Sequence, residues 1–331
     1  MLRKVERSVL SKLEVNSRQP LSKIGKKIGR SQQQISYTVN SLIEKGFIQN
    51  FETIIDYSKF NIINFRVFFK LSYVSEKKFD ELLSYLISDT RTSYLVRCGG
   101  RYDLICTFLT TNPSRFNKAL KNFIVEFPKQ VQNYNVLTTI VVRWFGRKYI
   151  SGSMYDQIII GGDRKTEIIN PISEKFDDID MKILNELSKD GRKSSVKIAE
   201  MLSVTPKTIM QRIKKLRNEK IILGFKPVLN SREMGYISNL LLIKYHNIAP
   251  EMENDMVNYL KVHPNVVSIV KTLGEWDIEI KIETSDTMEF RKVEIEIRQK
   301  FTLLIQQIES IPLYKIHKSN YFPEFLIKDQ F

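Results

Sequence analysis

The spacing of apolar residues divides the chain into segments of two kinds, and each kind occurs twice. Early in each half, apolar residues recur with a period close to 3.6, as in Val5, Val9 and Leu13, which predicts amphipathic helices. Later in each half the period changes to two: Phe65 and Val67 alternate with polar neighbours, which predicts strands. The chain is therefore expected to alternate small helical units with α+β units.

The two halves match each other at a constant shift of 174 residues. Matching residues include Leu10 and Leu184, Arg18 and Arg192, Ile24 and Ile198, Ile35 and Ile209, Phe51 and Phe225, Gly100 and Gly274, Asp103 and Asp277, and Phe116 and Phe290. One offset holds from residue 9 to beyond residue 116 without a gap, which indicates an internal duplication. Two copies of about 150 residues exclude a solenoid, so each copy forms a domain or a pair of domains.

Each copy opens with three short predicted helices joined by tight turns, the pattern of a helix-turn-helix. In the first copy the third helix begins at Ser31, and Gln34 is placed to complete a capping box. In the second copy Thr205 is the expected N-cap and Pro206 takes the first helical position. The segments after these helices, 46–55 and 221–229, are each predicted to form the two short strands of a wing.

The third helix of each copy has a polar face that could read DNA. Ile35, Val39 and Leu42 fall on one side and are expected in the core. The residues predicted to contact bases are Gln33, Ser36, Tyr37 and Asn40, and in the second copy Lys207, Met210, Gln211 and Lys214. Glutamine and asparagine pair with adenine edges, whereas lysine prefers guanine or phosphate. The predicted phosphate contacts are Lys23, Lys26, Lys27 and Arg30, with Arg212, Lys215 and Arg217 in the second copy.

The remainder of each copy follows the order strand, helix, strand, strand, helix, strand. The two central strands form hairpins about Gly99-Gly100-Arg101 and Gly274-Glu275. This order predicts a ferredoxin-like antiparallel sheet with both helices on one face. The open face still carries apolar side chains such as Phe68, so another surface must cover it.

Charge and cysteine content favour a DNA-binding protein over an enzyme. The net charge is +15, and residues 1–60 and 175–234 each contribute +6. Three widely spaced histidines and the lone pair Cys98 and Cys106 predict no metal site, no disulfide framework and no cofactor. No apolar stretch is long enough to span a membrane and no signal peptide is apparent, so we expect a cytoplasmic protein. No constellation of catalytic residues stands out in the sequence, so we expect that the protein is not an enzyme.

The chain resembles the leucine-responsive regulator/AsnC family of transcription factors. The stretch from Asp180 to Leu187 with Asp190-Gly191-Arg192 is the most specific part, and Ser17 departs from the pattern where glycine is usual. The resemblance implies double-stranded DNA as partner and a second domain that mediates assembly and can bind a small effector, typically an amino acid. The hairpin residues of the possible effector loop are Gly100, Asp103, Gly274 and Asp277.

The expected fold class is α+β, with two winged helix-turn-helix domains that are each followed by a βαββαβ ferredoxin-like domain. The expected divisions are 1–60 and 61–145 for the first copy, a linker at 146–176, 177–234 and 235–318 for the second copy, and a tail at 319–331. Residues 61–150 carry +8 and residues 235–331 carry −3. We therefore expect the two α+β domains to pair within one chain in place of the usual homodimer, with a higher oligomer also possible.

Two other functions fit the same architecture. Siroheme decarboxylases resemble this family and place histidine and arginine around a tetrapyrrole, but the first copy here contains no histidine. A sequence-tolerant chromatin protein would also be basic, and its specificity ratio at physiological salt would distinguish it from a regulator.

Overall fold

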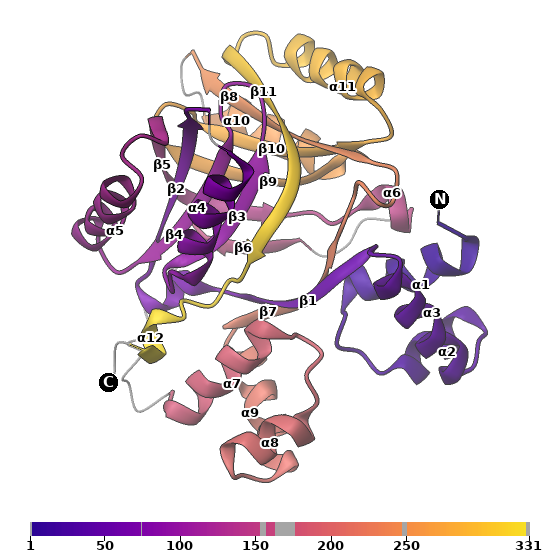
Figure 1. Ribbon diagram of the computed structural model, residues 1–331. Helices are drawn as coiled ribbons and strands as arrows, with labels where there is room; N and C mark the ends of the chain where they lie inside the picture. The colour runs from indigo at the N-terminus through magenta and orange to yellow at the C-terminus, as the bar shows by residue number, and fades with distance from the viewer. Residues whose placement is uncertain (1, 74, 153–156, 163–175, 247–249, 329–331) are drawn as a thin grey trace.

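The computed structural model describes residues 2–73, 75–152, 157–162, 176–246 and 250–328. Residues 153–156 and 163–175 of the expected linker and the last three residues of the expected tail lie outside this part. Figure 1 shows two small helical heads attached to a β-barrel that is flanked by helices. The fold class is the predicted one: each copy contributes a helix-turn-helix unit followed by a βαββαβ unit. Within the described ranges no helix has the length and apolar character needed to cross a membrane.

Each head is a bundle of three helices. In the first copy these are α1 (Lys4–Val15), α2 (Leu21–Ile28) and α3 (Gln32–Glu44), and in the second α7 (Asp178–Lys189), α8 (Ser195–Leu202) and α9 (Pro206–Asn218). The predicted caps are confirmed. Ser31 Oγ accepts from the Gln34 amide at 3.2 Å and Gln34 Oε1 accepts from the Ser31 amide at 3.1 Å. Thr205 Oγ1 accepts from the Thr208 amide at 3.1 Å.

The segment after each head is one strand, which corrects the prediction of a two-stranded wing. β1 (Ile48–Ile55) and β7 (Ile222–Leu229) pair with each other, antiparallel, across the two copies. We call this two-stranded sheet the ribbon. In its register Glu52 lies opposite Lys226, and these two residues are equivalent at the 174-residue shift. A pseudo-two-fold axis therefore crosses the ribbon between them. A strand with an unpaired edge needs a partner, and the other copy supplies it.

The loop after the first helix of each head docks on the strand of the other copy. The Ser17 amide donates to the Phe225 carbonyl at 2.9 Å, and the Gly191 amide donates to the Phe51 carbonyl at 2.6 Å. Arg18 donates to the Gly191 carbonyl and lies over the Phe225 ring, while its equivalent Arg192 donates to the Ser17 carbonyl and lies over Phe51. These reciprocal contacts hold both heads to the ribbon.

The remaining strands close into a barrel. In the first copy they are β2 (Ile63–Leu71), β3 (Thr92–Cys98), β4 (Leu104–Thr110) and β5 (Val131–Trp144), and in the second β8 (Ile237–Tyr245), β9 (Val266–Leu273), β10 (Ile278–Thr284) and β11 (Ile305–Ser319). The hydrogen-bonded order is β2, β4, β3, β11, β8, β10, β9 and β5, and β5 pairs again with β2. β3–β11 and β5–β9 join the two copies, so the predicted pairing of the α+β units within one chain is confirmed.

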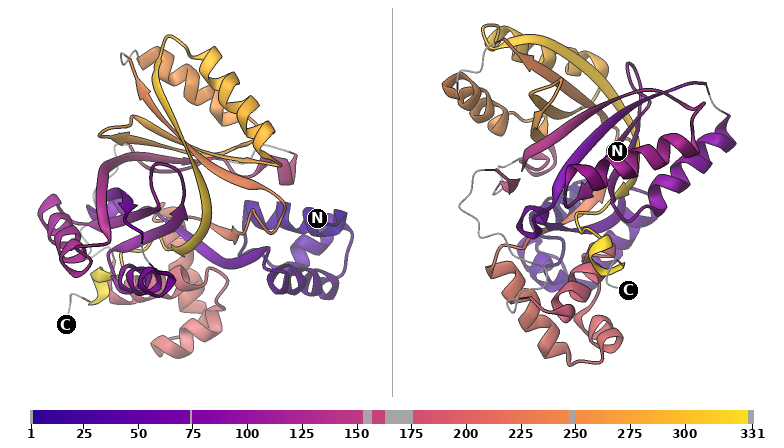
Figure 2. Two further views of the ribbon diagram at one scale, coloured as in Figure 1. Left: turned by 45° about the horizontal axis from the view of Figure 1, so that its top comes forward. Right: turned by 90° about the vertical axis from the view of Figure 1, so that its left-hand side faces the viewer.

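Helices cover the outside of the barrel. α4 (Glu76–Ser88) and α5 (Pro113–Glu126) pack on the strands of the first copy, and α10 (Pro250–Val262) and α11 (Thr287–Lys300) pack on those of the second. Figure 2 shows the two helix pairs on different flanks. Alternate residues of each strand face these helices, and the others face the interior. Phe68 is fully buried in the interior, against residues of both copies, so the apolar face predicted to need cover is closed by the other copy.

Short elements complete the chain. They are η1 (Tyr57–Phe60), α6 (Lys148–Ser151), β6 (Ile158–Gly161) and α12 (Phe325–Lys328). The described part of the expected linker is ordered into structure, because β6 pairs with β5. The described part of the expected tail is anchored: Phe322 and Phe325 are buried in the core of the second head.

The close contact between the loop at Gly191 and the ribbon predicts how a larger residue at this position would affect stability. A Cβ atom at Gly191 would lie 2.9 Å from the Glu52 carbonyl oxygen and 3.2 Å from that of Phe51, which is too close for either backbone. Gly191→Ala is therefore expected to lower the free energy of unfolding by about 1–3 kcal/mol, as overpacking does. Ser17, the equivalent residue of the first copy, already carries a Cβ, so Ser17→Ala is the matched control and should not lower stability, because the Ser17 hydroxyl is buried without a partner in the described residues. Urea unfolding measures the free energy of unfolding of both variants. An equal effect of the two changes would contradict the expected difference between the two loops.

Candidate functional site

The predicted reading faces of α3 and α9 are exposed. Gln33, Tyr37 and Asn40 of α3 are open to solvent and Ser36 is half-buried; on α9, Lys207, Met210, Gln211 and Lys214 are all open. The opposite faces are buried, with Ile35, Leu42, Ile209 and Leu216 in the cores of the two heads. Tyr37 and Met210 are 74% and 56% exposed, although side chains of this size are more often buried. Both helices therefore present polar and apolar side chains to solvent on the face opposite the buried one.

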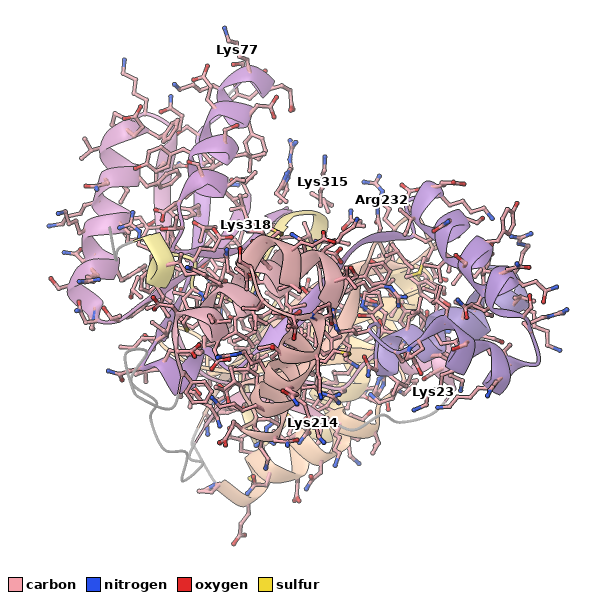
Figure 3. All side chains as sticks on the ribbon, turned by 90° about the horizontal axis from the view of Figure 1, so that it is seen from below. Lys23, Lys77, Lys214, Arg232, Lys315 and Lys318 are labelled. Atoms are coloured by element: carbon pink, nitrogen blue, oxygen red, sulfur yellow. The ribbon has the colours of Figure 1, made fainter. Side chains whose placement is uncertain are left out.

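The predicted phosphate contacts divide into two groups. Lys23, Lys26, Lys27 and Arg30 are exposed along α2 and the turn that follows it, and Arg217 is exposed near the end of α9. Figure 3 shows Lys23 and Lys214, one on each head, from below the molecule.

Arg212 and Lys215 form the second group, because they pair with carboxylates of their own head. Arg212 Nη1 lies 2.6 Å from Asp177 Oδ1 and 3.0 Å from Asp180 Oδ1, and Lys215 Nζ lies 3.2 Å from Asp180 Oδ2. Asp180 is fully buried, so these pairs tie α9 to α7. Their predicted role as phosphate contacts would compete with this pairing.

The residues of the possible effector loop tie each hairpin to a neighbouring strand. Asp103 Oδ2 accepts from the Leu71 amide at 2.9 Å, and Asp277 Oδ2 accepts from the Tyr245 amide at 2.8 Å. Lys70 and Lys244 pair with the same carboxylates. Gly100 and Gly274 occupy the turns at positive φ, +81° and +149°. None of the four loop residues lines the cavity at the junction of the barrel and the ribbon. Their role in effector binding stays a prediction.

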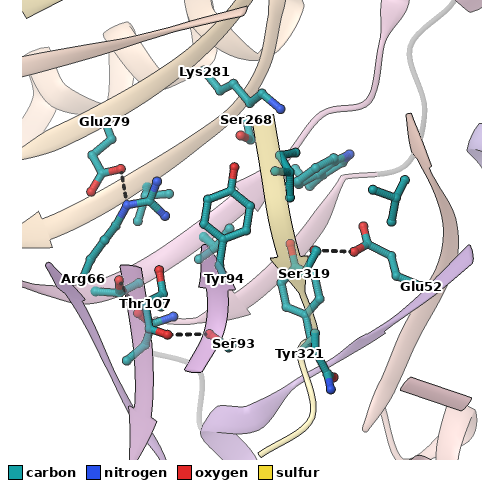
Figure 4. Close-up of a pocket in the computed structure, with 18 of the residues that line it drawn as sticks. Glu52, Arg66, Ser93, Tyr94, Thr107, Ser268, Glu279, Lys281, Ser319 and Tyr321 are labelled. Carbon is teal, nitrogen blue, oxygen red and sulfur yellow. Dashed lines mark hydrogen bonds and ion pairs between the residues drawn. The ribbon is translucent and has the colours of Figure 1, made fainter. Parts of the chain in front are cut away.

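A cavity of about 110 Å³ lies where one end of the barrel meets the ribbon. Its walls come from strands of both copies, from the ribbon and from the chain after β11. In Figure 4, Arg66 and Glu279 lie on one side, Glu52 lies on the other, and Tyr94 and Tyr321 lie between them. The cavity thus contacts both the barrel and the element that carries the heads.

A buried ion pair across the two copies forms one wall of the cavity. Arg66 Nε lies 2.8 Å from Glu279 Oε2, and the carboxylate side chain is completely buried. Burial raises the pKa of Glu279 to about 7, although the charge of Arg66 opposes this rise. Thr107 Oγ1 and Trp144 Nε1 are buried near this pair without a hydrogen-bond partner in the described residues.

A second buried network fixes the first head to the barrel. Arg147 Nη1 lies 2.8 Å from Glu14 Oε1 on α1, and Arg147 Nε lies 2.8 Å from Glu283 Oε2 on β10. Burial alone would raise the pKa of Glu283, but Arg147 and Lys281 lower it to about 2. Glu14, Arg147 and Glu283 therefore form a charged link from α1 to the barrel beside the cavity.

Sequence reasoning missed the cavity. Arg66 shares the strand face of Phe68, for which we expected cover, but nothing in the strand pattern indicated a cavity beside it. Tyr321 was assigned to the tail. One signal was available: at the 174-residue shift Arg66 corresponds to Leu240 and Glu279 to Ile105, so each charge replaces an apolar residue of the other copy.

Removal of one partner of the Arg66–Glu279 pair should destabilise the fold. Arg66→Leu leaves a buried carboxyl group without its cation, and we expect a loss of about 1–3 kcal/mol because Glu279 can take up a proton at neutral pH. The double variant Arg66→Leu/Glu279→Ile gives each position the residue of the other copy and should recover most of this loss. Urea unfolding of the wild type, both single variants and the double variant measures the coupling; strictly additive effects would contradict it.

Glu52 should make stability depend on pH. Burial raises the pKa of Glu52 to about 7 from an ordinary 4.5, despite the hydrogen bond from Ser319. Stability from this group is therefore fully present below pH 4.5 and is lost as the pH rises through 7. Glu52→Gln removes this titration, so the stability of the variant relative to the wild type should rise by about 1–3 kcal/mol between pH 5 and pH 8. Unfolding curves across this range test the prediction, and a difference that stays constant with pH would contradict it.

The chain is similar in sequence to known transcriptional regulators. Residues 176–217 match the AsnC-type helix-turn-helix domain. The HTH-type transcriptional regulator FL11 of Pyrococcus furiosus is 32% identical over 114 residues, which are 34% of this chain and 74% of FL11. The regulatory protein AsnC of Haemophilus influenzae is 31% identical over 118 residues, which are 36% of this chain and 78% of that protein.

The whole fold is also similar to a solved structure, that of the siroheme decarboxylase NirDL. The match covers 98% of this chain and 97% of NirDL with a TM-score of 0.61, at 11% sequence identity. At that identity the likeness shows the fold alone, whereas the sequence matches to regulators carry the relationship. The chain therefore belongs to the leucine-responsive regulator/AsnC family.

Proposed function

We propose that the protein is a sequence-specific DNA-binding transcriptional regulator that acts as a pseudo-dimer within one chain. The observation that carries the proposal is the pair of exposed, capped third helices, α3 and α9, held together by one ribbon. A dimeric helix-turn-helix protein binds two half-sites at a spacing set by its two-fold axis. Here the ribbon and the reciprocal Arg18 and Arg192 contacts fix two heads in the same way without a second chain.

Charge supports this function. Each head segment, residues 1–60 and 175–234, has a net charge of +6. Phosphate contacts of lysine and arginine supply most of the affinity for DNA and steer association. The exposed residues Lys23, Lys26, Lys27 and Arg30 would supply these contacts in the first head, and Arg217 with Lys214 would supply them in the second.

The two heads would read different half-sites. The face with Gln33 and Asn40 suits adenine edges, whereas the equivalent residues Lys207 and Lys214 suit guanine or phosphate. An identical pair of heads would select a palindrome. These unequal heads would instead select an asymmetric operator.

The alternative function is that of a siroheme decarboxylase, which the fold of NirDL brings forward. Sites for drug-sized ligands usually enclose about 300–1,000 Å³. The cavity at the ribbon has about 110 Å³, and of the described residues that line it none is a histidine, whereas hollows of about 320, 530 and 560 Å³ lie elsewhere on the described part of the chain. A visible spectrum after incubation with iron siroheme tests the alternative directly, and a decarboxylated product would overturn the regulator proposal.

DNA binding is tested by selection of operator sequences followed by fluorescence anisotropy with purified protein. Lys207→Ala/Lys214→Ala should weaken binding and reduce the salt slope by about 1–2, because up to two phosphate contacts are lost. Gln33→Ala/Asn40→Ala should reduce discrimination at one half-site by about 1–3 kcal/mol per lost bidentate contact.

The matched control is Lys77→Ala/Lys121→Ala, which removes two exposed lysines from the helices α4 and α5 of the barrel. This control should leave the salt slope unchanged if the heads bind the DNA. Equal weakening by both lysine pairs would point to a sequence-tolerant chromatin protein, as would a specificity ratio near one at physiological salt. The mass of the complex in solution tests the pseudo-dimer: one chain on a two-half-site operator is the expected result.

A further inference from the structure

We propose that the cavity between the barrel and the ribbon binds a small organic monocarboxylate, and that the bound ligand changes DNA affinity through the ribbon. The binding site stands on the cavity itself, whereas the effect on DNA rests on the proposed function. The hairpin residues expected to form an effector loop lie elsewhere, so this site is separate from that prediction.

The polarity of the cavity is the first observation. Elsewhere the barrel interior is filled by apolar side chains such as Phe68, Leu242 and Trp276. At the cavity end, Thr107 Oγ1 and Trp144 Nε1, which can both donate, are buried without a hydrogen-bond partner in the described residues. A buried polar group without a partner costs about 1–3 kcal/mol, so unpartnered atoms around one small void indicate that a bound molecule completes them.

The charges of the cavity select the ligand class. Arg66 presents five N–H donors, and Glu279 lies within ion-pair distance of one nitrogen, Nε. A guanidinium binds a carboxylate through two parallel hydrogen bonds, a geometry that a single carboxylic acid can meet. Arg147 and Lys281 also line the cavity, but both are paired with buried carboxylates. A dianion such as phosphate would bring a second negative charge close to Glu279 and Glu52, so the site favours a monoanion.

Size and shape limit the ligand further. One water molecule needs about 10–15 Å³ of cavity space, so a cavity of about 110 Å³ has room for several waters or for an acid with a short carbon chain. Apolar residues of several strands, among them Leu109, Leu240 and Val270, line the cavity and suit such a chain.

The duplication makes this site asymmetric. At the 174-residue shift the charged residues Arg66, Glu279 and Lys281 correspond to Leu240, Ile105 and Thr107. A dimer of identical chains would present each group twice across its axis. The tandem chain presents each group once, so a single small molecule with unlike ends can bind in one orientation.

Contact with the ribbon provides the coupling. Glu52 of β1 and residues 227–229 of β7 line the cavity, and Ser319 Oγ donates to Glu52 Oε2 at 2.7 Å. β1 begins four residues after α3 ends, and β7 begins four residues after α9 ends. A ligand that prefers one ribbon geometry therefore favours one arrangement of the two reading helices.

Ligand binding is measured by isothermal titration calorimetry on the full chain. The probes are propanoate, butanoate, 3-methylbutanoate, pyruvate, L-alanine and L-valine. Propanamide and propylamine are the control compounds that lack the carboxylate. At least one carboxylate should bind one site per chain with a Kd below about 1 mM, and the amide and the amine should bind at least tenfold more weakly. No binding by any of the carboxylates, or equal binding of the amide, would overturn the site.

Variants locate the site within the molecule. Arg66→Leu/Glu279→Ile should abolish binding while its unfolding midpoint reports that it folds, and the nearly isosteric Thr107→Val should weaken binding without affecting the charges. Lys78→Gln/Glu81→Gln is the matched control, because it removes an exposed ion pair on α4 that lies outside the cavity. Unchanged affinity in the Arg66 variant, or equal loss in the control, would place the ligand elsewhere.

The coupling is measured by DNA anisotropy with and without the carboxylate that binds. Ligand at saturation should change the affinity for the selected operator at least fivefold. Equal DNA affinity with and without ligand would overturn the coupling but not the proposed binding site. A chain that binds the carboxylate but no DNA would refute the proposed function alone, and one that binds DNA but no carboxylate would refute the site alone.

Discussion

The pairing of β1 with β7 is the constraint on which the rest of the molecule depends. Each strand lies between a head and a barrel half of its own copy, yet its hydrogen-bond partner belongs to the other copy. This pairing places the core of the second head against Ile54 and Ile55 of the first copy, and the core of the first head against Leu229 of the second. Neither head has a complete core without the other half of the chain. The two copies are therefore expected to fold as one unit instead of as two independent repeats.

Barrel closure extends the same exchange. A ferredoxin-like sheet has one face covered by its own helices, and its other face needs a second sheet. Because β3 pairs with β11 and β5 pairs with β9, the two open faces meet and no long strand edge remains in the ring. A homodimer could close in the same way. Fusion of the copies adds the freedom for equivalent positions to diverge, as Arg66 and Leu240 have.

Local signals predicted the parts of the fold that local contacts determine. The caps at Ser31 and Thr205, the helix faces around Ile35 and the order of strands and helices all depend on neighbours within one turn or one hairpin. The wing was wrong because strand pairing is a long-range choice: the sequence of 46–55 predicts extended structure but does not name its partner. The cavity beside Arg66 was missed for the same reason: the face that Arg66 shares with Phe68 was expected to need cover, but the strand pattern does not show which groups of the other copy close over it.

The repeat itself carries information that a single copy lacks. Where equivalent residues agree, as at Arg18 and Arg192, the structure shows the same contact made twice, and the contact maintains the pseudo-two-fold fold. Where a buried charged residue corresponds to an uncharged residue in the other copy, the fold does not require the charge, because the other copy folds in the same way with an uncharged side chain. Arg66 and Glu279 are such residues. A buried charge that the fold does not need is costly to keep. Divergence of this kind within one chain therefore points to function, and here it converges on the junction of the barrel with the two helix-turn-helix heads.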